Sequence, residues 1–207
     1  ELSAARRRLY HRQIADTLET VPPPPEKASV LAYHLERAGE NERALAYWME
    51  AGRHALDTYA YQQSARHYER ALALTDQPAA QMEAYLGLAR AFILLDDHQA
   101  AAAVVRQGLG LAQQHGDDAR RTRLLYAQAQ NASRQHRSDG GKPEVEAALG
   151  AAEEVGDQVY LAQSLLLLTE VHESSGDLGK ALETATRAQV ASSGLRDSQL
   201  EARGLVE

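Results

Sequence analysis

The stretch AYQQSARHYERALAL, from Ala60 to Leu74, combines small and large side chains at helical spacing. Ser64 and Ala71 are seven residues apart and share one face of a helix, with Tyr68 between them on that face. Small residues let a neighbouring backbone approach, and the large side chain fills the space beside them. The stretch predicts a helix packed closely against other helices, with His67 and Glu69 flanking the packing face in solvent.

The same packing face recurs along the chain. Small residues stand at the position of Ser64 in four other segments: Ala44, Ala101, Gly141 and Ala181. They recur seven positions later, where Ala71 stands in the first stretch: Ala51, Gly108, Ala148 and Ala188. Mostly small residues also stand on the preceding helix, twelve positions before each residue of the Ser64 set: Ala32, Gly52, Ala89, Ala129 and Thr169. One such pair of helices cannot bury its face alone, so the pattern predicts stacked pairs.

The composition also favours helices. The chain of 207 residues contains 38 Ala and 28 Leu, against 10 Val and 2 Ile. Ala and Leu are strong helix formers, whereas strands favour β-branched and aromatic side chains. We therefore expect an all-α fold.

Helix-breaking residues divide the chain into about eleven expected helices. Prolines at 22–25 end the first helix, and Gly39 and Gly176 stand where a left-handed cap is favoured. The expected helices are 3–20, 28–39, 42–58, 61–75, 79–95, 98–115, 118–136, 143–155, 158–175, 178–193 and 197 onward. We expect 1–21 to be an N-terminal helix that ends an upstream domain or caps the fold, 22–27 a proline-rich linker, and 28–207 helical repeats truncated at the C-terminus.

The repeats resemble tetratricopeptide repeats (TPRs). Two segments are similar to the second helices of such repeats, GDLGKALETATRAQ (176–189) and AYQQSARHYERALAL (60–74), and the most similar stretch is LLLLTEVHESSGDLGKALETATRA (165–188). The repeat length is the spacing between successive small residues at the Ser64 position. It is 37 residues from Ser64 to Ala101, and 40 residues from Ala101 to Gly141 and again to Ala181. This length resembles the longer repeats of bacterial regulators of the maltose-activator kind. The 20 residues from Ala44 to Ser64 are too few for a repeat, so 42–58 is interpreted as a helix shared by two pairs. The resemblance implies a right-handed superhelix of TPR-like helix pairs.

The N-terminal third resembles a segment of bacterial multidomain signal-transduction ATPases. The resemblance covers roughly residues 5–75 and is carried by RRRLYHRQIADTLE (6–19) and LAYHLERAGENERALAYWMEAGRHALDTYAY (31–61). That family includes transcriptional activators and some nucleotide cyclases, in which an ATPase core precedes a winged-helix-like piece and helical repeats. The resemblance matches no catalytic residue of the family.

No set of residues has the spacing of a catalytic or metal site. Ser64 and His67 are neighbours on a helix, but Glu69 lies two residues from His67 and points elsewhere, so no triad forms. SDGGKP (138–143) lacks the phosphate-loop pattern, because Pro143 replaces the magnesium-binding hydroxyl. The eight histidines contain no His-Glu-x-x-His pattern. We expect no enzymatic activity, no metal and no cofactor.

Charge and hydropathy exclude further classes of function. The formal net charge of −7 argues against direct nucleic-acid binding, which depends on clustered Lys and Arg. No apolar run approaches the roughly 20 residues of a membrane helix, and no signal peptide is present. We expect a cytoplasmic bacterial protein that contacts neither membrane nor nucleic acid. Because the chain stops within the repeat pattern, we also expect it to be part of a longer protein.

The concave face of a helical-repeat solenoid is its usual binding surface. By resemblance, the first helix of each pair lines that face: 42–58, 79–95, 118–136 and 158–175. The candidate ligand- or partner-binding residues point away from the packing positions of these helices: Arg53, Glu83, Arg90, Tyr126, Gln130, Arg134, Glu170 and Glu173. Arg90, Tyr126 and Arg134 are the favoured group, because Arg and Tyr are frequent at contact hot spots. A plain solvated face is the alternative.

The repeat pattern predicts a non-catalytic interaction module, and the resemblance implies that it regulates a bacterial multidomain transcription factor. The expected ligand is a partner protein, a peptide, an inducer or the neighbouring domains of the same chain. The alternative is an assembly scaffold or homodimerisation module of a non-transcriptional signalling protein, such as a nucleotide cyclase.

Overall fold

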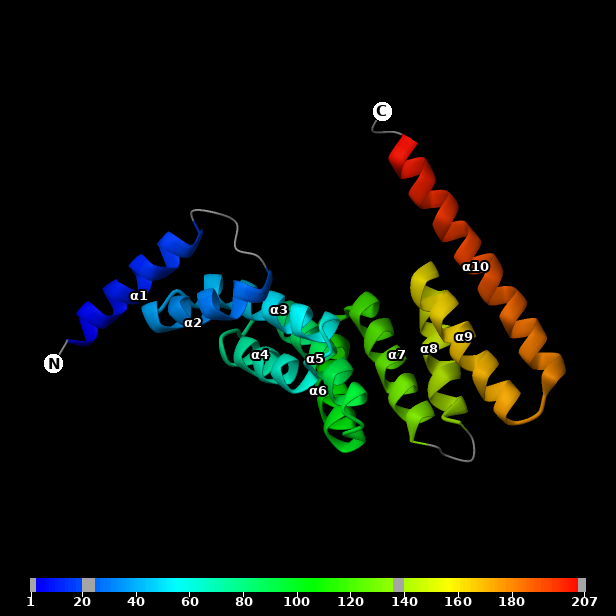
Figure 1. Ribbon diagram of the computed structural model, residues 1–207. Helices are drawn as coiled ribbons and strands as arrows, with labels where there is room; N and C mark the ends of the chain where they lie inside the picture. The colour runs from blue at the N-terminus through cyan, green and yellow to red at the C-terminus, as the bar shows by residue number, and fades with distance from the viewer. Residues whose placement is uncertain (1–2, 20–24, 136–139, 205–207) are drawn as a thin grey trace. The chain divides into compact units, whose positions relative to one another are not determined.

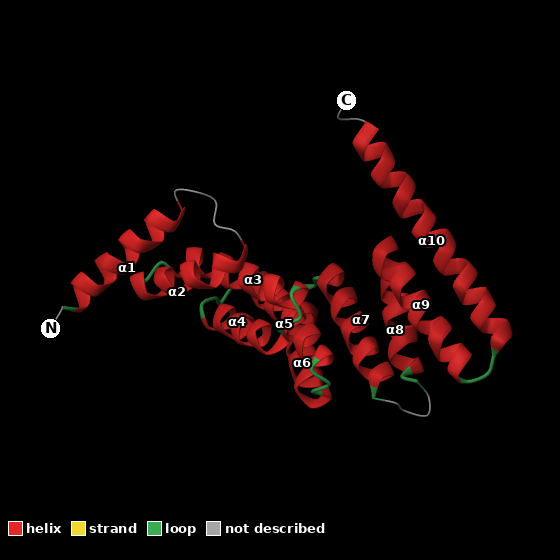
Figure 2. Ribbon diagram, viewed as in Figure 1, coloured by secondary structure: helices red, strands yellow, loops and turns green. Residues whose placement is uncertain are grey.

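The computed structural model describes residues 3–19, 25–135 and 140–204, and these ranges form α-helices without any strand (Figure 1, Figure 2). The helices are α1 (Ala4–Glu19), α2 (Ala28–Ala38), α3 (Asn41–Asp57), α4 (Tyr61–Ala73), α5 (Pro78–Leu94), α6 (His98–His115), α7 (Asp118–Arg134), α8 (Lys142–Val155), α9 (Gln158–Ser174) and α10 (Leu178–Gly204). A short 3-10 helix, Pro25–Lys27, precedes α2. The expected all-α fold is confirmed.

The chain forms two compact units, Glu1–Ala100 and Ala101–Glu207. In the first unit, each helix from α1 to α5 packs against the next helix along the chain, and α3 also touches α5. In the second unit, α7 to α10 pack in the same consecutive order, and α7 also touches α9. Contact between the first helices of successive pairs is what a helical-repeat stack requires.

Six turns between helices share one backbone arrangement. In each, a residue in the left-handed region ends a helix, and the N–H of the next residue donates to the carbonyl oxygen five positions earlier. The left-handed residues are Gly39, Tyr59, Asp96, Gly116, Gly156 and Gly176. The expected caps at Gly39 and Gly176 are confirmed. Tyr59, with φ of 63°, is a bulky residue in a region that favours glycine.

An aspartate follows the left-handed residue in four of these turns: Asp97, Asp117, Asp157 and Asp177. In each case Oδ1 accepts a hydrogen bond from the backbone N–H three residues later, over 2.9 to 3.3 Å. This is the bond of a helix N-cap. The left-handed residue and the aspartate together end one helix and begin the next, which keeps consecutive helices adjacent.

Tyr68 on α4 packs between glycines of the two neighbouring helices. Ser64 is fully buried, and its Oγ donates to the carbonyl oxygen of Gly52 on α3 at 2.8 Å. A Cβ atom at Gly52 would lie 2.8 Å from Tyr68 Cε2, and one at Gly87 on α5 would lie 2.3 Å from Tyr68 Cζ. Since Cβ atoms do not approach other atoms this closely, only glycine admits the ring at both positions.

The predicted packing face is buried throughout the repeats. The small residues at its two positions are buried in every segment: Ala44, Ser64, Ala101, Gly141 and Ala181, then Ala51, Ala71, Gly108, Ala148 and Ala188. The larger residues between them are buried as well: Trp48, Tyr68, Val105 and Val145. The last segment has Ala185 at the position equivalent to Tyr68, and Ala185 is half-buried.

The C-terminal end of the expected pattern is corrected. The sequence predicts two helices, 178–193 and 197 onward, whereas α10 runs without a break from Leu178 to Gly204. Gly194 lies inside it, and a single glycine costs a helix interior only about 1 kcal/mol relative to alanine. The described part of the chain therefore has ten α-helices rather than about eleven. Residues 20–24, with half of the expected linker 22–27, and residues 136–139 lie outside the described residues.

Candidate functional site

The eight candidate residues lie on α3, α5, α7 and α9, which are first helices of the pairs. Five of them are exposed: Arg53, Arg90, Arg134, Glu170 and Glu173. Three are half-buried: Glu83, Tyr126 and Gln130. Those on α3 and α5 belong to the first unit and those on α7 and α9 to the second, so each unit has a candidate surface of its own.

In the first unit, the candidate residues gather beside the phenol of Tyr68. The charges of four residues act electrostatically on this hydroxyl: Arg53 and Asp57 on α3, and Glu83 and Arg90 on α5. Burial raises the pKa of Tyr68, the two carboxylates act in the same direction, and the two arginines oppose it. The buried hydroxyl therefore lies within the electrostatic range of four charged side chains. We name these five residues the Tyr68 cluster: Arg53, Asp57, Tyr68, Glu83 and Arg90.

Helical spacing explains this convergence. Arg53 and Asp57 are four residues apart on α3, and Arg53 directly follows Gly52, which contacts the ring of Tyr68. On α5, Glu83 and Arg90 are four residues before and three residues after Gly87, which contacts the same ring. The glycines that admit Tyr68 therefore also bring the charged residues to its hydroxyl.

The second unit contains a smaller group around Tyr126. Its ring meets that of Tyr160 on α9 edge to face, with the centroids 5.4 Å apart, and Gln130 Nε2 donates to its hydroxyl at 3.2 Å. Burial raises the pKa of Tyr126; the hydrogen bond from Gln130 opposes this rise, and Tyr160 and Glu170 add to it. We name these residues the Tyr126 cluster: Tyr126, Gln130, Tyr160 and Glu170.

The clusters include residues that the sequence pattern does not single out as site residues. Asp57 follows Arg53 by one helical turn and could have been found by extending the helix face. Tyr160 lies 34 residues from Tyr126, and no local signal joins them. Arg134 and Glu173 lie near the C-terminal ends of α7 and α9, outside the Tyr126 cluster. The group of Arg90, Tyr126 and Arg134 spans both units and stays a prediction.

Ser64 and His67 do not form a nucleophilic pair, since Ser64 Oγ donates to the Gly52 carbonyl oxygen. Glu69 is exposed as predicted, but the prediction that His67 lies in solvent is wrong. His67 is half-buried and stacks on Trp48, with the ring centroids 5.2 Å apart and the planes at 25°. Burial lowers the pKa of His67. The sequence could not show this contact, because Trp48 belongs to the preceding helix.

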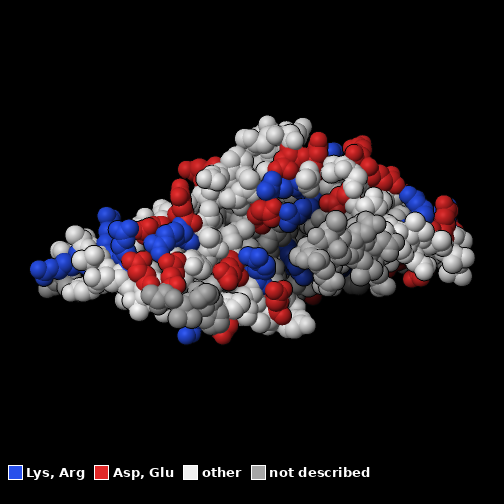
Figure 3. Space-filling model, turned by 90° about the horizontal axis from the view of Figure 1, so that it is seen from above, with Lys and Arg blue, Asp and Glu red and all other residues white. Residues whose placement is uncertain are grey.

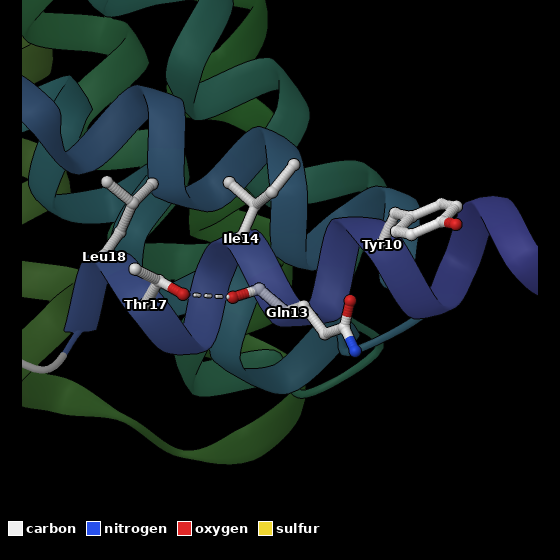
Figure 4. A pocket seen from close by; sticks show the side chains of 5 residues that line it. All are labelled: Tyr10, Gln13, Ile14, Thr17 and Leu18. Atoms are coloured by element: carbon white, nitrogen blue, oxygen red, sulfur yellow. Dashed lines mark hydrogen bonds between the residues drawn. The ribbon is translucent and has the colours of Figure 1, made fainter.

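Other surfaces of the described residues offer less chemistry. None of their His, Asp and Glu side chains gather in groups of three or more that could hold a metal ion. A depression on α1 is lined by Tyr10, Gln13, Ile14, Thr17 and Leu18, and within it Thr17 donates to the Gln13 carbonyl oxygen at 2.7 Å (Figure 4). All five residues come from one helix, and none is charged.

Surface charge is mixed in sign. On the face viewed in Figure 3, Lys and Arg side chains are interspersed with Asp and Glu side chains, without one large basic area. The helices of the described ranges are too short or too polar to cross a bilayer.

Comparison with known proteins finds the fold but no close relative. No family model matches the chain, and no curated protein matches its sequence. The chain is similar to the crystal structure of a Rap protein complexed with competence and sporulation factor, with a TM-score of 0.65 and 14% identity, over 89% of this chain and 52% of that one. It is also similar to BtubC (BKLC) from P. vanneervenii, with a TM-score of 0.68 and 18% identity, over 93% of this chain and 89% of that one.

These likenesses and the consecutive helix pairs define the class of protein. The chain is an all-α helical-repeat protein, a solenoid of TPR-like helix pairs. It spans about half the length of the Rap protein.

Proposed function

We propose that the chain is a non-catalytic interaction module that binds a partner protein or peptide on the first helices of its repeats. The observation that carries this proposal is the Tyr68 cluster, where the exposed Arg53, Asp57 and Arg90 act electrostatically on a buried hydroxyl. Arg and Tyr are enriched among residues that contribute most to binding, and charged groups at a surface select a complementary partner. The repeat stack supplies a rigid base for these side chains.

The structural likeness supports the same class of ligand. The Rap protein, which has the same type of fold, was solved in complex with competence and sporulation factor. In the second unit, the Tyr126 cluster also combines a tyrosine with a charged neighbour, Glu170, on the first helices α7 and α9. Each unit therefore offers a candidate contact surface of its own.

We further propose that the module regulates a bacterial multidomain transcription factor in the cytoplasm. The support is the resemblance of 6–19 and 31–61 to bacterial signal-transduction ATPases. The full-length open reading frame tests this context. A phosphate-loop ATPase encoded upstream is expected, and a gene that starts near residue 1 contradicts the context.

A second candidate function, self-association, is favoured by α10. Leu178, Leu182 and Val190 on this helix are 71%, 71% and 70% exposed, although all three are apolar. Exposed apolar surface of this kind favours association. Light scattering that finds only monomer at high concentration would remove this candidate.

Site-specific photo-crosslinking in cells tests the binding proposal. A photoreactive residue placed at Arg90 on α5 should give an adduct with a partner, which mass spectrometry identifies. The matched control is Arg66, an exposed arginine on α4 in the same unit. Adducts that form equally from both positions, or from neither, would contradict binding at the Tyr68 cluster.

A further inference from the structure

Helix α1 is attached to the first unit mainly by polar contacts. Ala15 is its only buried residue in the described range. Arg12 pairs with Glu40 at 2.7 Å, and Arg43 on α3 pairs with Asp16 at 3.3 Å and also with Glu19. Apolar packing contributes little to this attachment, so its strength depends on charge.

Two histidines meet at the centre of this attachment. Nδ1 of His11 on α1 lies 2.9 Å from Nδ1 of His34 on α2, and the ring centroids are 5.0 Å apart. A hydrogen bond over this distance needs one nitrogen to donate and the other to accept, so at least one imidazole must be neutral. If both rings are protonated, two N–H groups and two positive charges face each other, and the bond becomes repulsion.

The carboxylates that join α1 to its neighbours in the described residues, Asp16, Glu19 and Glu40, are already engaged in ion pairs. The ring of Tyr33 meets both imidazoles, with centroid distances of 5.9 and 5.4 Å, and Arg37 lies over that ring at 5.3 Å. The charged groups of the neighbouring helices are already paired with one another: Arg12, Asp16 and Glu19 on α1, Glu40 after α2, and Arg43 on α3. A second proton on the histidine pair would therefore stay uncompensated.

We propose that protonation of the His11–His34 pair releases α1 from α2, so that the attachment of this helix depends on pH. This inference does not rest on the proposed function, because it concerns a contact outside both tyrosine clusters. It assigns to α1 the role of a detachable element, which leaves the repeats that begin at α2 in place.

The direction of the effect follows from the pKa of His34. Burial, and then the charge of His11, lower this pKa below the ordinary value of 6.5. The attached state therefore binds fewer protons than the released state. The contribution of the neutral histidine pair to the attachment of α1 is fully present above about pH 6.5. It is lost as the pH falls through the lowered pKa. For each proton that the attached state excludes, the equilibrium constant of attachment falls by up to about tenfold per pH unit.

Hydrogen exchange of the whole chain tests the proposal. The measurement compares about pH 7.5 with about pH 5.5, corrected for intrinsic exchange rates, in a chelator that removes metal ions. Protection of the α1 amides should fall measurably at the lower pH, by up to about tenfold, while α4 and α9 keep theirs. The double variant His11→Gln/His34→Gln should lose this pH dependence, because glutamine can hydrogen-bond but does not titrate in this range. The matched control, His115→Gln at an exposed position on α6, should behave as the wild type.

Two outcomes overturn the proposal: α1 protection that does not change with pH in the wild type, or an equal change in the double variant. If the double variant has already lost α1 protection at about pH 7.5, NMR titration of the wild-type imidazoles decides. The pair should take up its two protons in separate steps, the second below the ordinary histidine range. Two independent titrations at ordinary values would reject the proposal.

Discussion

Tyr68 joins the packing of the first unit to its candidate binding surface. Its ring occupies the space that Gly52 and Gly87 leave open, and it is 5% exposed. Its hydroxyl lies within the electrostatic range of Arg53, Arg90 and two carboxylates. The same side chain therefore fixes the separation of α3, α4 and α5 and forms the centre of the Tyr68 cluster.

The Gly87→Ala variant should be less stable than the wild type by about 1–3 kcal/mol, the usual cost of overpacking. The added Cβ would lie 2.3 Å from Tyr68 Cζ, so the ring or the helix must move. Urea unfolding followed by circular dichroism measures the change. The matched control is Gly150→Ala on α8, where a Cβ meets nothing within 4 Å, and it should gain about 0.5–1 kcal/mol. Equal stability of Gly87→Ala and the wild type would contradict this packing.

At the scale of the element, the turns decide how the helices follow one another. A left-handed residue closes each of six helices, and in four turns the next residue is an aspartate that caps the following helix. These local bonds leave no room for a loop, so the next helix must fold back beside the previous one. The packing faces then meet in the register that the small residues require.

The cap at Asp117 should make stability depend on pH. The hydrogen bond from the backbone N–H of Arg120 is the main cause that lowers the pKa of Asp117 below 3.8. The stabilisation that the charged cap gives the folded state is therefore present above about pH 3.8 and is lost as the pH falls through the lowered pKa. Asp117→Asn keeps a hydrogen-bond acceptor but removes the charge. We expect a loss of less than about 1 kcal/mol near neutral pH and little difference from the wild type in acid.

Urea unfolding of both chains at about pH 7 and about pH 3 measures this difference. The control is Asp76→Asn, which changes an exposed aspartate that does not begin a helix. The cap has no role in the pH dependence if Asp117→Asn and Asp76→Asn differ from the wild type by the same amount at both pH values.

At the scale of the whole molecule, two units repeat one packing scheme, and each carries a candidate surface on its own helices. The first unit carries the Tyr68 cluster and the second the Tyr126 cluster. In each cluster a tyrosine feels the charge of first-helix residues, four in the first unit and Glu170 alone in the second. Under the proposed function, the question is how the affinity for a partner is divided between the two units.

Charge reversal at one arginine in each unit measures this division. Arg90→Glu and Arg134→Glu should each weaken binding of the cross-linked partner about tenfold, and the double variant should combine both losses. Fluorescence anisotropy gives the affinity, and circular dichroism should show unchanged helicity. The control is Arg66→Glu on α4. Binding that survives Arg134→Glu but not Arg90→Glu would confine the site to the first unit.

Much of the fold could be predicted because its signals are local. Gly39 and Gly176 marked helix ends, and the buried stripe of small residues was found from its spacing alone. The break expected near residue 194 was wrong, because one glycine in a long helix costs too little to end it. For the candidate site, the sequence indicated which helices present the residues, but it did not group them into clusters.

The sequence by itself determined that the chain is helical, where most helices begin and end, and which face of each helix packs. These properties follow from propensity, capping and periodicity, all of which act within a few residues. Only the tertiary structure decided that Tyr68 lies between Gly52 and Gly87, that His67 stacks on Trp48, and that His11 meets His34. Each of these contacts joins different helices, and its geometry depends on how closely the backbones approach, which local periodicity does not encode.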